Sequence, residues 1–316
     1  MDRLLYYAAL ALVRLLQSLP LRLVARIGRA GGALAYLLDG RHRRVAFKNL
    51  TMCFGDEKSA KEIRAITREN FRRLGENYAS AIKTAAMSWP SLKPQCEFIG
   101  EQNLLPQPLP NPPSIVVAIG HFGNFELYAR IGQHIPMLHG ATTYRGLRQP
   151  SLNRLMQSLR ERAGCLFFER RKDADALKAA MNRRGIVLGL LADQHAGNNG
   201  LRLPFLGHEC STSAAPAVFA LRYHCPLHTG ICYRVGLGQW RIEAGPEIPV
   251  RDAQGKPRPV TDIMLDVNRV FEAAVRRDPA NWFWVHDRWK PSARVPVTKQ
   301  LRPAALSSVT DNPPVL

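Results

Sequence analysis

A histidine and a glutamate lie five residues apart near the middle of the chain, at the end of an apolar run. The segment reads Ser114-Ile-Val-Val-Ala-Ile-Gly-His-Phe-Gly-Asn-Phe-Glu126. An imidazole held by a carboxylate is the base half of a catalytic triad, because the carboxylate fixes the tautomer and stabilises the imidazolium. His121 is therefore a candidate general base, a role typically worth about 10²–10⁴ in rate.

The attacking nucleophile is expected to come from the substrate, because no serine or cysteine adjoins His121. Glu126 can reach back to the imidazole only if the segment bends, and Gly123 allows that bend. Asn124 suits the N-cap of the helix that follows, with Glu126 in its first turn. The alternative is a structural histidine, since a lone pair at this spacing occurs often by chance.

Apolar runs alternate with helical patterns through most of the chain. Strands are expected at 114–119, 139–144, 165–168, 186–192, 227–233 and 239–244, and helices at 57–86, 152–163, 174–184, 213–223 and 261–277. This alternation predicts an α/β fold with a mostly parallel central sheet flanked by helices. His121 and Asp193 both follow apolar strands, so both are expected at the same edge of the sheet, where ligands bind.

The two ends of the chain differ in composition from the main domain, which is expected at residues 39–290. Residues 1–38 are apolar and punctuated by arginines, and the run from Leu4 to Val13 is too short to span a bilayer. We interpret 1–38 as an amphipathic helical segment lying in a membrane interface, the alternative being helices packed on the domain. Residues 291–316 lack periodicity and are expected to be a disordered tail.

The charge balance indicates an anionic partner. The 316 residues include 44 Lys or Arg against 25 Asp or Glu, a formal net charge of +19. A membrane surface, a phosphorylated substrate, an acidic carrier protein or nucleic acid would each fit. The six cysteines contain no CxxC pair, which suits reduced core thiols in a cytosolic setting.

Six sequence blocks, met in order, carry a family resemblance. The segment Gly120-His-Phe-Gly-Asn-Phe-Glu126 looks like the catalytic motif of the lipid A biosynthesis acyltransferases, the late lauroyl and myristoyl transferases. The other blocks are Arg43–Leu50, Tyr144-Arg145 with the basic stretch to Asp173, Ala192-Asp-Gln194, Leu203–Gly207 and Trp282–Lys290. The resemblance runs from about Arg41 to Lys290 and implies a glycerolipid-acyltransferase-like fold.

The resemblance also implies roles for individual residues. His121 would be the general base and Glu126 its carboxylate partner, while Arg162 and Asp193 occupy positions that the family uses for activity. Arg145 and Asn124 are expected to bind substrate, and neither a metal nor a cofactor is expected. The basic stretch Tyr144–Lys172 carries eight Lys or Arg, which suit phosphate binding.

Three functions follow as hypotheses. The first is a membrane-associated acyltransferase on the cytoplasmic face of the inner membrane, which moves a fatty acyl chain from acyl carrier protein to a hydroxyl of an anionic lipid A precursor. The second keeps the chemistry but uses another glycolipid or phospholipid, such as a phosphatidylinositol mannoside, and acyl coenzyme A. The third is a non-enzymatic basic protein binding membrane or nucleic acid, although no nucleic-acid-binding module is recognisable.

Overall fold

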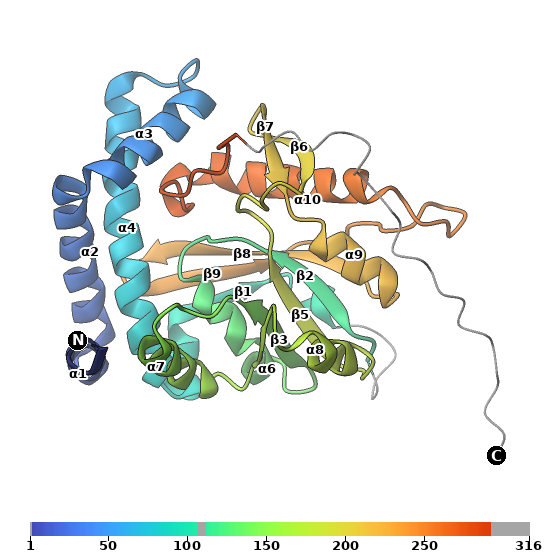
Figure 1. Cartoon of the computed structure of the whole chain (residues 1–316), viewed down its shortest axis with the longest axis horizontal. Helices are drawn as coiled ribbons and strands as arrows, with labels where there is room; N and C mark the ends of the chain where they lie inside the picture. The colour runs from blue at the N-terminus through green and yellow to red at the C-terminus, as the bar shows by residue number, and fades with distance from the viewer. Residues whose placement is uncertain (1, 106–111, 292–316) are drawn as a thin grey trace.

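A seven-stranded sheet forms the centre of the computed structural model, which describes residues 2–105 and 112–291 (Figure 1). In spatial order the strands are β1 (Cys96–Ile99), β9 (Gln239–Ala244), β8 (Leu227–Gly236), β2 (Ile115–Ile119), β5 (Ile186–Leu191), β3 (His139–Tyr144) and β4 (Leu166–Glu169). The strands from β8 to β4 run parallel, whereas β9 is antiparallel to β8 and β1 is parallel to β9. The predicted mostly parallel α/β sheet is confirmed.

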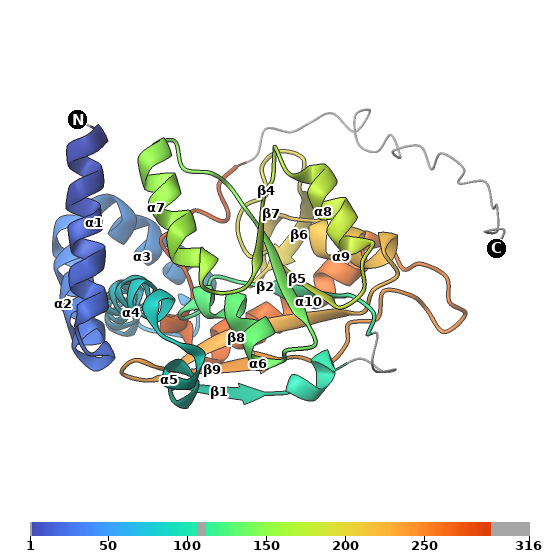
Figure 2. The same cartoon turned by 90° about the horizontal axis from the view of Figure 1, so that it is seen from below.

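Helices surround this sheet and also form a separate layer at one end of it (Figures 1 and 2). They are α1 (Asp2–Ser18), α2 (Leu21–Leu38), α3 (Gly40–Phe54), α4 (Ala60–Ala86), α5 (Trp89–Leu92), α6 (Ile131–His134), α7 (Pro150–Glu161), α8 (Ala174–Met181), α9 (Ala215–Arg222) and α10 (Val260–Arg277). Short 3₁₀ helices are η1 (Lys93–Gln95), η2 (Glu101–Leu104), η3 (Phe125–Arg130) and η4 (Pro279–Asn281).

Strand β2 is buried along its whole length and divides two cores. Because side chains alternate across a strand, Val116 and Ala118 join the large core that includes residues of α9 and α10. Val117 and Ile119 point to the opposite face, towards η3 and α6. A continuous apolar strand is typical of the middle of a parallel sheet, which helices cover on both faces.

Several elements differ from the sequence expectation. A β-hairpin, β6 (Leu201–Phe205) with β7 (His208–Thr212), replaces the expected loop, and its turn has positive φ at both Leu206 and Gly207. Leucine is unusual in such a turn, so the sequence carried little signal for it. Helix α4 begins at residue 60 because the side chains of Ser59 and Glu62 form a reciprocal capping box. The tail was predicted at residues 291–316, and all of it beyond residue 291 lies outside the described residues.

Helices α2 and α4 pack so closely that their backbones touch. A Cβ atom at Gly32 would lie 2.1 Å from the carbonyl oxygen of Phe71, and one at Gly75 would lie 2.1 Å from that of Gly28. Only glycine fits at these positions. Beside this glycine seam, Arg29 forms ion pairs with Glu69 and the fully buried Glu76. Arg29 therefore faces α4, so this arginine of the predicted interfacial segment is not available to lipid headgroups.

Many large apolar side chains of the first two helices remain exposed. They are Leu4, Leu5, Tyr7, Leu12 and Leu15 on α1, and Leu23, Ile27, Leu34, Leu37 and Leu38 on α2. We call this set the N-terminal apolar surface. Within residues 2–105 and 112–291, no helix combines the length and the hydropathy needed to cross a bilayer.

Replacing Gly32 by alanine is expected to destabilise the fold, because the added methyl group meets a backbone oxygen that cannot move aside. Overpacking of this kind typically costs about 1–3 kcal/mol. The measurement is thermal unfolding followed by circular dichroism. Gly31→Ala is the matched control: a Cβ there meets nothing within 4 Å, so the helix should be at least as stable as the parent. Equal melting temperatures for the two variants would contradict the close-packed seam.

Candidate active site

His121 leaves the carboxyl end of β2 and lines a large cavity. The turn that follows it requires glycine, because Gly123 has a φ of 50° and a Cβ there would lie 2.6 Å from the carbonyl oxygen of Cys232. The amide of Gly123 donates to the carbonyl oxygen of Asn281 at 3.1 Å. The backbone after His121 is thus fixed by its close approach to Cys232 and by its hydrogen bond to Asn281. The bend predicted at Gly123 is present.

The carboxylate beside His121 belongs to Asp193, at the end of the neighbouring strand β5. His121 Nδ1 lies 2.8 Å from Asp193 Oδ1, and the His121 amide donates to Oδ2 at 2.7 Å. The indole Nε1 of Trp282 donates to the same Oδ2 at 2.9 Å. The prediction that His121 and Asp193 emerge together at one edge of the sheet is confirmed.

Asp193 is fully buried yet ionised. Burial alone would raise its pKa, but the adjacent His121 ring, its hydrogen bonds and the positive charge of Arg288 together lower the pKa to about 2. An ionised carboxylate accepts hydrogen bonds only, so His121 Nδ1 carries the proton and donates it. The lone pair of the imidazole is then on Nε2, on the side of the ring away from Asp193.

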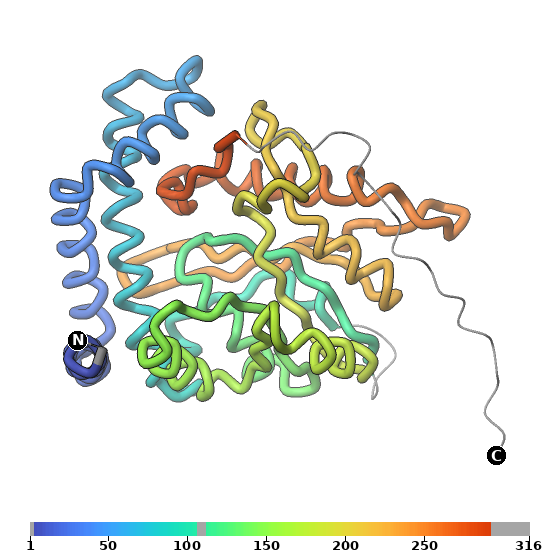
Figure 3. The backbone as a smooth tube through the Cα atoms, in the orientation of Figure 1, coloured from blue at the N-terminus to red at the C-terminus, as the bar shows by residue number. Residues whose placement is uncertain are grey.

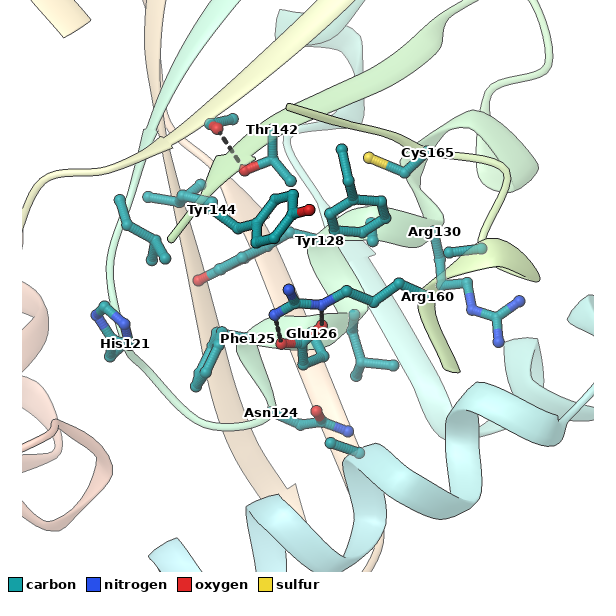
Figure 4. Close-up of a pocket in the computed structure, with 18 of the residues that line it drawn as sticks. His121, Asn124, Phe125, Glu126, Tyr128, Arg130, Thr142, Tyr144, Arg160 and Cys165 are labelled. Atoms are coloured by element: carbon teal, nitrogen blue, oxygen red, sulfur yellow. Dashed lines mark hydrogen bonds and ion pairs between the residues drawn. The ribbon is translucent and has the colours of Figure 1, made fainter. Parts of the chain in front are cut away.

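Glu126 does not have the place that the sequence predicted for it. In the described structure its carboxylate pairs with Arg160, with Oε1–Nη2 at 2.6 Å and Oε2–Nε at 3.1 Å, and Figure 4 shows Phe125 between this pair and His121. The physical reason is the 3₁₀ helix η3, which begins at Phe125 and carries Glu126 past the imidazole towards α7. Asp193, expected to bind substrate, has the position beside His121 instead.

The cavity in front of His121 has a volume of about 900 Å³ and is mostly apolar. Residues of the sheet and residues of helices α4 and α7 line it. The apolar lining residues include Val117 and Ile119 of β2, Leu191 of β5, Ala81 and Ile82 of α4 and Leu159 of α7. Its polar lining residues include His121, Glu126, Arg160 and Tyr144 (Figure 4). Such a cavity suits a long apolar chain with one reactive polar end.

The remaining predicted site residues are distributed unevenly around this cavity. Arg145 lines it and is exposed, and Asn124 lines it while being 1% exposed. Asn124 occupies the N-cap position of η3, as predicted, but its side chain makes no capping hydrogen bond there. Arg162 is exposed at the end of α7, where its carbonyl oxygen accepts from Arg130 and Gln133. Arg160, two residues earlier on α7, lines the cavity, whereas Arg162 does not.

Two further residues contact the His121–Asp193 pair, and the sequence assigned neither of them a role although both lie in the blocks of the family resemblance. Trp282 is buried and donates to Asp193. Gln194 follows Asp193, and its Nε2 lies 3.3 Å from His121 Nε2. A second histidine, His286, lies nearby; burial lowers its pKa to about 4, and its Nε2 accepts from the His195 amide. His286 is therefore neutral at pH 7.

The profile of the family described as bacterial lipid A biosynthesis acyltransferase matches residues 1–291. The chain belongs to this family. The lipid A biosynthesis palmitoleoyltransferase of Escherichia coli (strain K12) is 28% identical to this acyltransferase over 288 residues, 86% of this chain and 87% of the relative. The lauroyltransferase of the same organism is 25% identical over 285 residues, covering 87% and 88%. A Haemophilus influenzae lipid A biosynthesis acyltransferase is 26% identical over 306 residues, covering 92% and 93%.

Replacing Asp193 by asparagine is expected to lower turnover by about 10⁴-fold, because an amide can hold the imidazole in the wrong tautomer. Stability should fall as well. The carboxylate has a lowered pKa, so its contribution is full above the ordinary value of 3.8 and is lost as the pH falls towards 2. The difference in unfolding free energy between parent and variant should therefore be constant near neutral pH and shrink below about pH 4.

The control for this variant is Asp175→Asn. Asp175 has a side chain that is 95% exposed and pairs only with Lys178 in the described structure. It should keep full activity and nearly full stability. Acyl transfer by Asp193→Asn at the parent rate would overturn the role of the buried carboxylate.

Proposed function

We propose that this acyltransferase moves a fatty acyl chain from the thioester of acyl carrier protein to a hydroxyl of a lipid A precursor. The observation that carries the proposal is the His121 imidazole, fixed by Asp193 and lining a 900 Å³ apolar cavity. The relatives named as palmitoleoyltransferase and lauroyltransferase support a fatty acyl chain as the transferred group. The family match supports lipid A as the acceptor class.

The chemistry is a direct transfer with His121 as the general base. The acceptor hydroxyl gives its proton to His121 Nε2 as its oxygen attacks the thioester carbonyl carbon. The carbon–sulfur bond then breaks, and the imidazolium returns the proton to the leaving thiolate. The products are an ester and a free thiol. Asp193 stabilises the imidazolium that exists between the two proton transfers.

Glu126 acts in this scheme by orienting Arg160. A bidentate carboxylate fixes the guanidinium plane, and Arg160 is further packed against the rings of Phe167 and Tyr144, at 5.1 and 5.9 Å from their centroids. The guanidinium is thus held where the polar end of a bound substrate would lie. Arg145 and Asn124 line the same cavity and are the proposed contacts to the anionic acceptor and to the acyl donor.

The basic stretch at the cavity supports an acidic donor protein. Arg145 and Arg170 line the cavity, and exposed arginines and a lysine surround them in the sequence. The exposed set is Arg145, Arg148, Arg170, Arg171 and Lys172. Opposite charges steer association, so acyl carrier protein would be guided to the cavity from this side.

We further propose that the protein lies on the cytoplasmic face of the inner membrane. The N-terminal apolar surface supports this, because its large apolar side chains have no partner elsewhere in residues 2–105 and 112–291 that covers them. Arg41, Arg44 and Lys48 are exposed on α3, directly after α2. Apolar side chains beside exposed cations are typical of an interfacial helix on anionic lipid.

The test of the activity is lipid analysis with one catalytic variant and one control variant. A deletion strain should accumulate lipid A that lacks one secondary acyl chain, and the parent gene should restore that chain, as read by mass spectrometry. His121→Ala should fail to restore it, because the base is lost. His42→Ala, at an exposed histidine of α3, is the control and should restore it. Unchanged lipid A in the deletion strain, with a changed phospholipid, would favour the other acceptor class.

Charge placed on the N-terminal apolar surface should release the protein from membranes. In Leu34→Glu/Leu37→Glu/Leu38→Glu, three exposed leucines of α2 become acidic, which removes apolar burial and adds repulsion from anionic lipid. Co-sedimentation with vesicles containing anionic phospholipid should fall by at least about tenfold. Leu166, exposed on β4, offers the control Leu166→Glu, which should still sediment. Equal sedimentation of both variants would place the membrane contact elsewhere.

A further inference from the structure

We propose that the side-chain amide of Gln194 is the donor that stabilises the oxyanion formed during acyl transfer. This inference rests on the proposed direct attack of a hydroxyl on a thioester, and it adds a catalytic residue to that reaction. Its starting point is one contact: Gln194 Nε2 lies 3.3 Å from His121 Nε2, and both residues line the cavity.

The direction of this contact follows from the buried carboxylate. Asp193 accepts a hydrogen bond from the protonated Nδ1, so His121 Nε2 carries a lone pair and can only accept. Gln194 must therefore present an N–H to Nε2. That N–H is aimed at the place where the hydroxyl of the acceptor has to lie before it gives up its proton.

The oxyanion forms next to that place. After attack, the former hydroxyl oxygen and the former carbonyl oxygen are bonded to the same tetrahedral carbon. When the former hydroxyl oxygen lies beside His121 Nε2, it takes the place of the Gln194 amide there. The amide N–H can then donate to the former carbonyl oxygen, which is bonded to the same carbon. Preorganised donors directed at a developing oxyanion are the largest single contribution in many acyl transfers.

Several other donors near His121 are already engaged in the described structure. The backbone N–H groups of His121, Phe122 and Gly123 donate to Asp193, to the Gly120 carbonyl and to the Asn281 carbonyl. After β5, the N–H groups of His195 and Ala196 donate to His286 and to the Ser211 carbonyl. Arg160 uses Nε and Nη2 for Glu126. Gln194, by contrast, has a long contact with one nitrogen, which a substrate readily replaces.

The proton and electron balance is that of an ordinary acyl transfer. The hydroxyl proton moves to His121 Nε2, and the thioester carbonyl electrons move onto the oxygen that Gln194 holds. When the carbonyl re-forms, the carbon–sulfur bond breaks and the thiolate takes the proton. Gln194 exchanges no proton; it only donates a hydrogen bond to the oxyanion.

The test is steady-state kinetics of Gln194→Met, which keeps the length of the side chain but has no N–H. We expect kcat to fall by about 10²–10³-fold with little change in KM, because the lost hydrogen bond exists only in the transition state. The loss should persist at every pH. If Gln194 affected only the protonation of the base, its replacement would shift the pH at which kcat is maximal and leave the maximal kcat unchanged. Gln102→Met, at an exposed glutamine of η2, is the control for the chemical change itself.

Two reactions are followed so that each hypothesis can fail alone. Thioester hydrolysis by water needs the base and the oxyanion donor but no lipid acceptor, whereas acyl transfer to a lipid A precursor needs all of them. If the parent enzyme hydrolyses the thioester but transfers no acyl chain to a lipid A precursor, the proposed function is wrong. The hydrolysis reaction then still tests the role of Gln194. A folded Gln194→Met enzyme that works within about threefold of the parent in both reactions would overturn the oxyanion role.

Discussion

The carboxylate of Asp193 is the interaction on which the site depends. Its side chain has no solvent exposure, and a buried charge is costly unless hydrogen bonds compensate it. Three donors do so: the His121 amide, the His121 ring and the Trp282 indole. They come from the end of β2 and from a segment 89 residues after Asp193, so the orientation of the base requires that the whole centre of the fold be assembled.

The segment that delivers Trp282 has no regular structure and is held by buried asparagines. Asn70 of α4 donates to the carbonyl oxygens of Ala280 and Trp282, and Asn49 of α3 donates to those of Trp284 and His286. Irregular backbone can be buried only when its polar groups find partners. These side chains supply the partners that a neighbouring strand would otherwise give. Figure 3 shows the segment, at the red end of the described chain, lying between α4 and α10.

The sequence predicted what depends on local pattern. The parallel strands, the position of His121 after β2 and its meeting with Asp193 all follow from apolar runs and from the shared edge of parallel strands. The sequence did not identify the carboxylate that pairs with His121, because both Glu126 and Asp193 were expected close to it. Which of the two pairs with His121 depends on the path of η3. The pattern of apolar residues in the sequence does not predict this 3₁₀ helix. The α2–α4 contact was missed for a similar reason, since the match of Gly32 to Gly75 is visible only between helices.

Helix α4 serves two parts of the molecule at once. One side of it forms the glycine seam with α2, and Asn77, Ala81 and Ile82 line the cavity. A seam of backbone against backbone has no flexible side chains to absorb movement. In the proposed orientation, the depth at which α2 settles into the leaflet therefore sets the height of the cavity above the lipid. Because this height would be constant, the enzyme would select among acceptor hydroxyls by their distance from the acyl region of the membrane. This selection would precede any discrimination by side chains of the site.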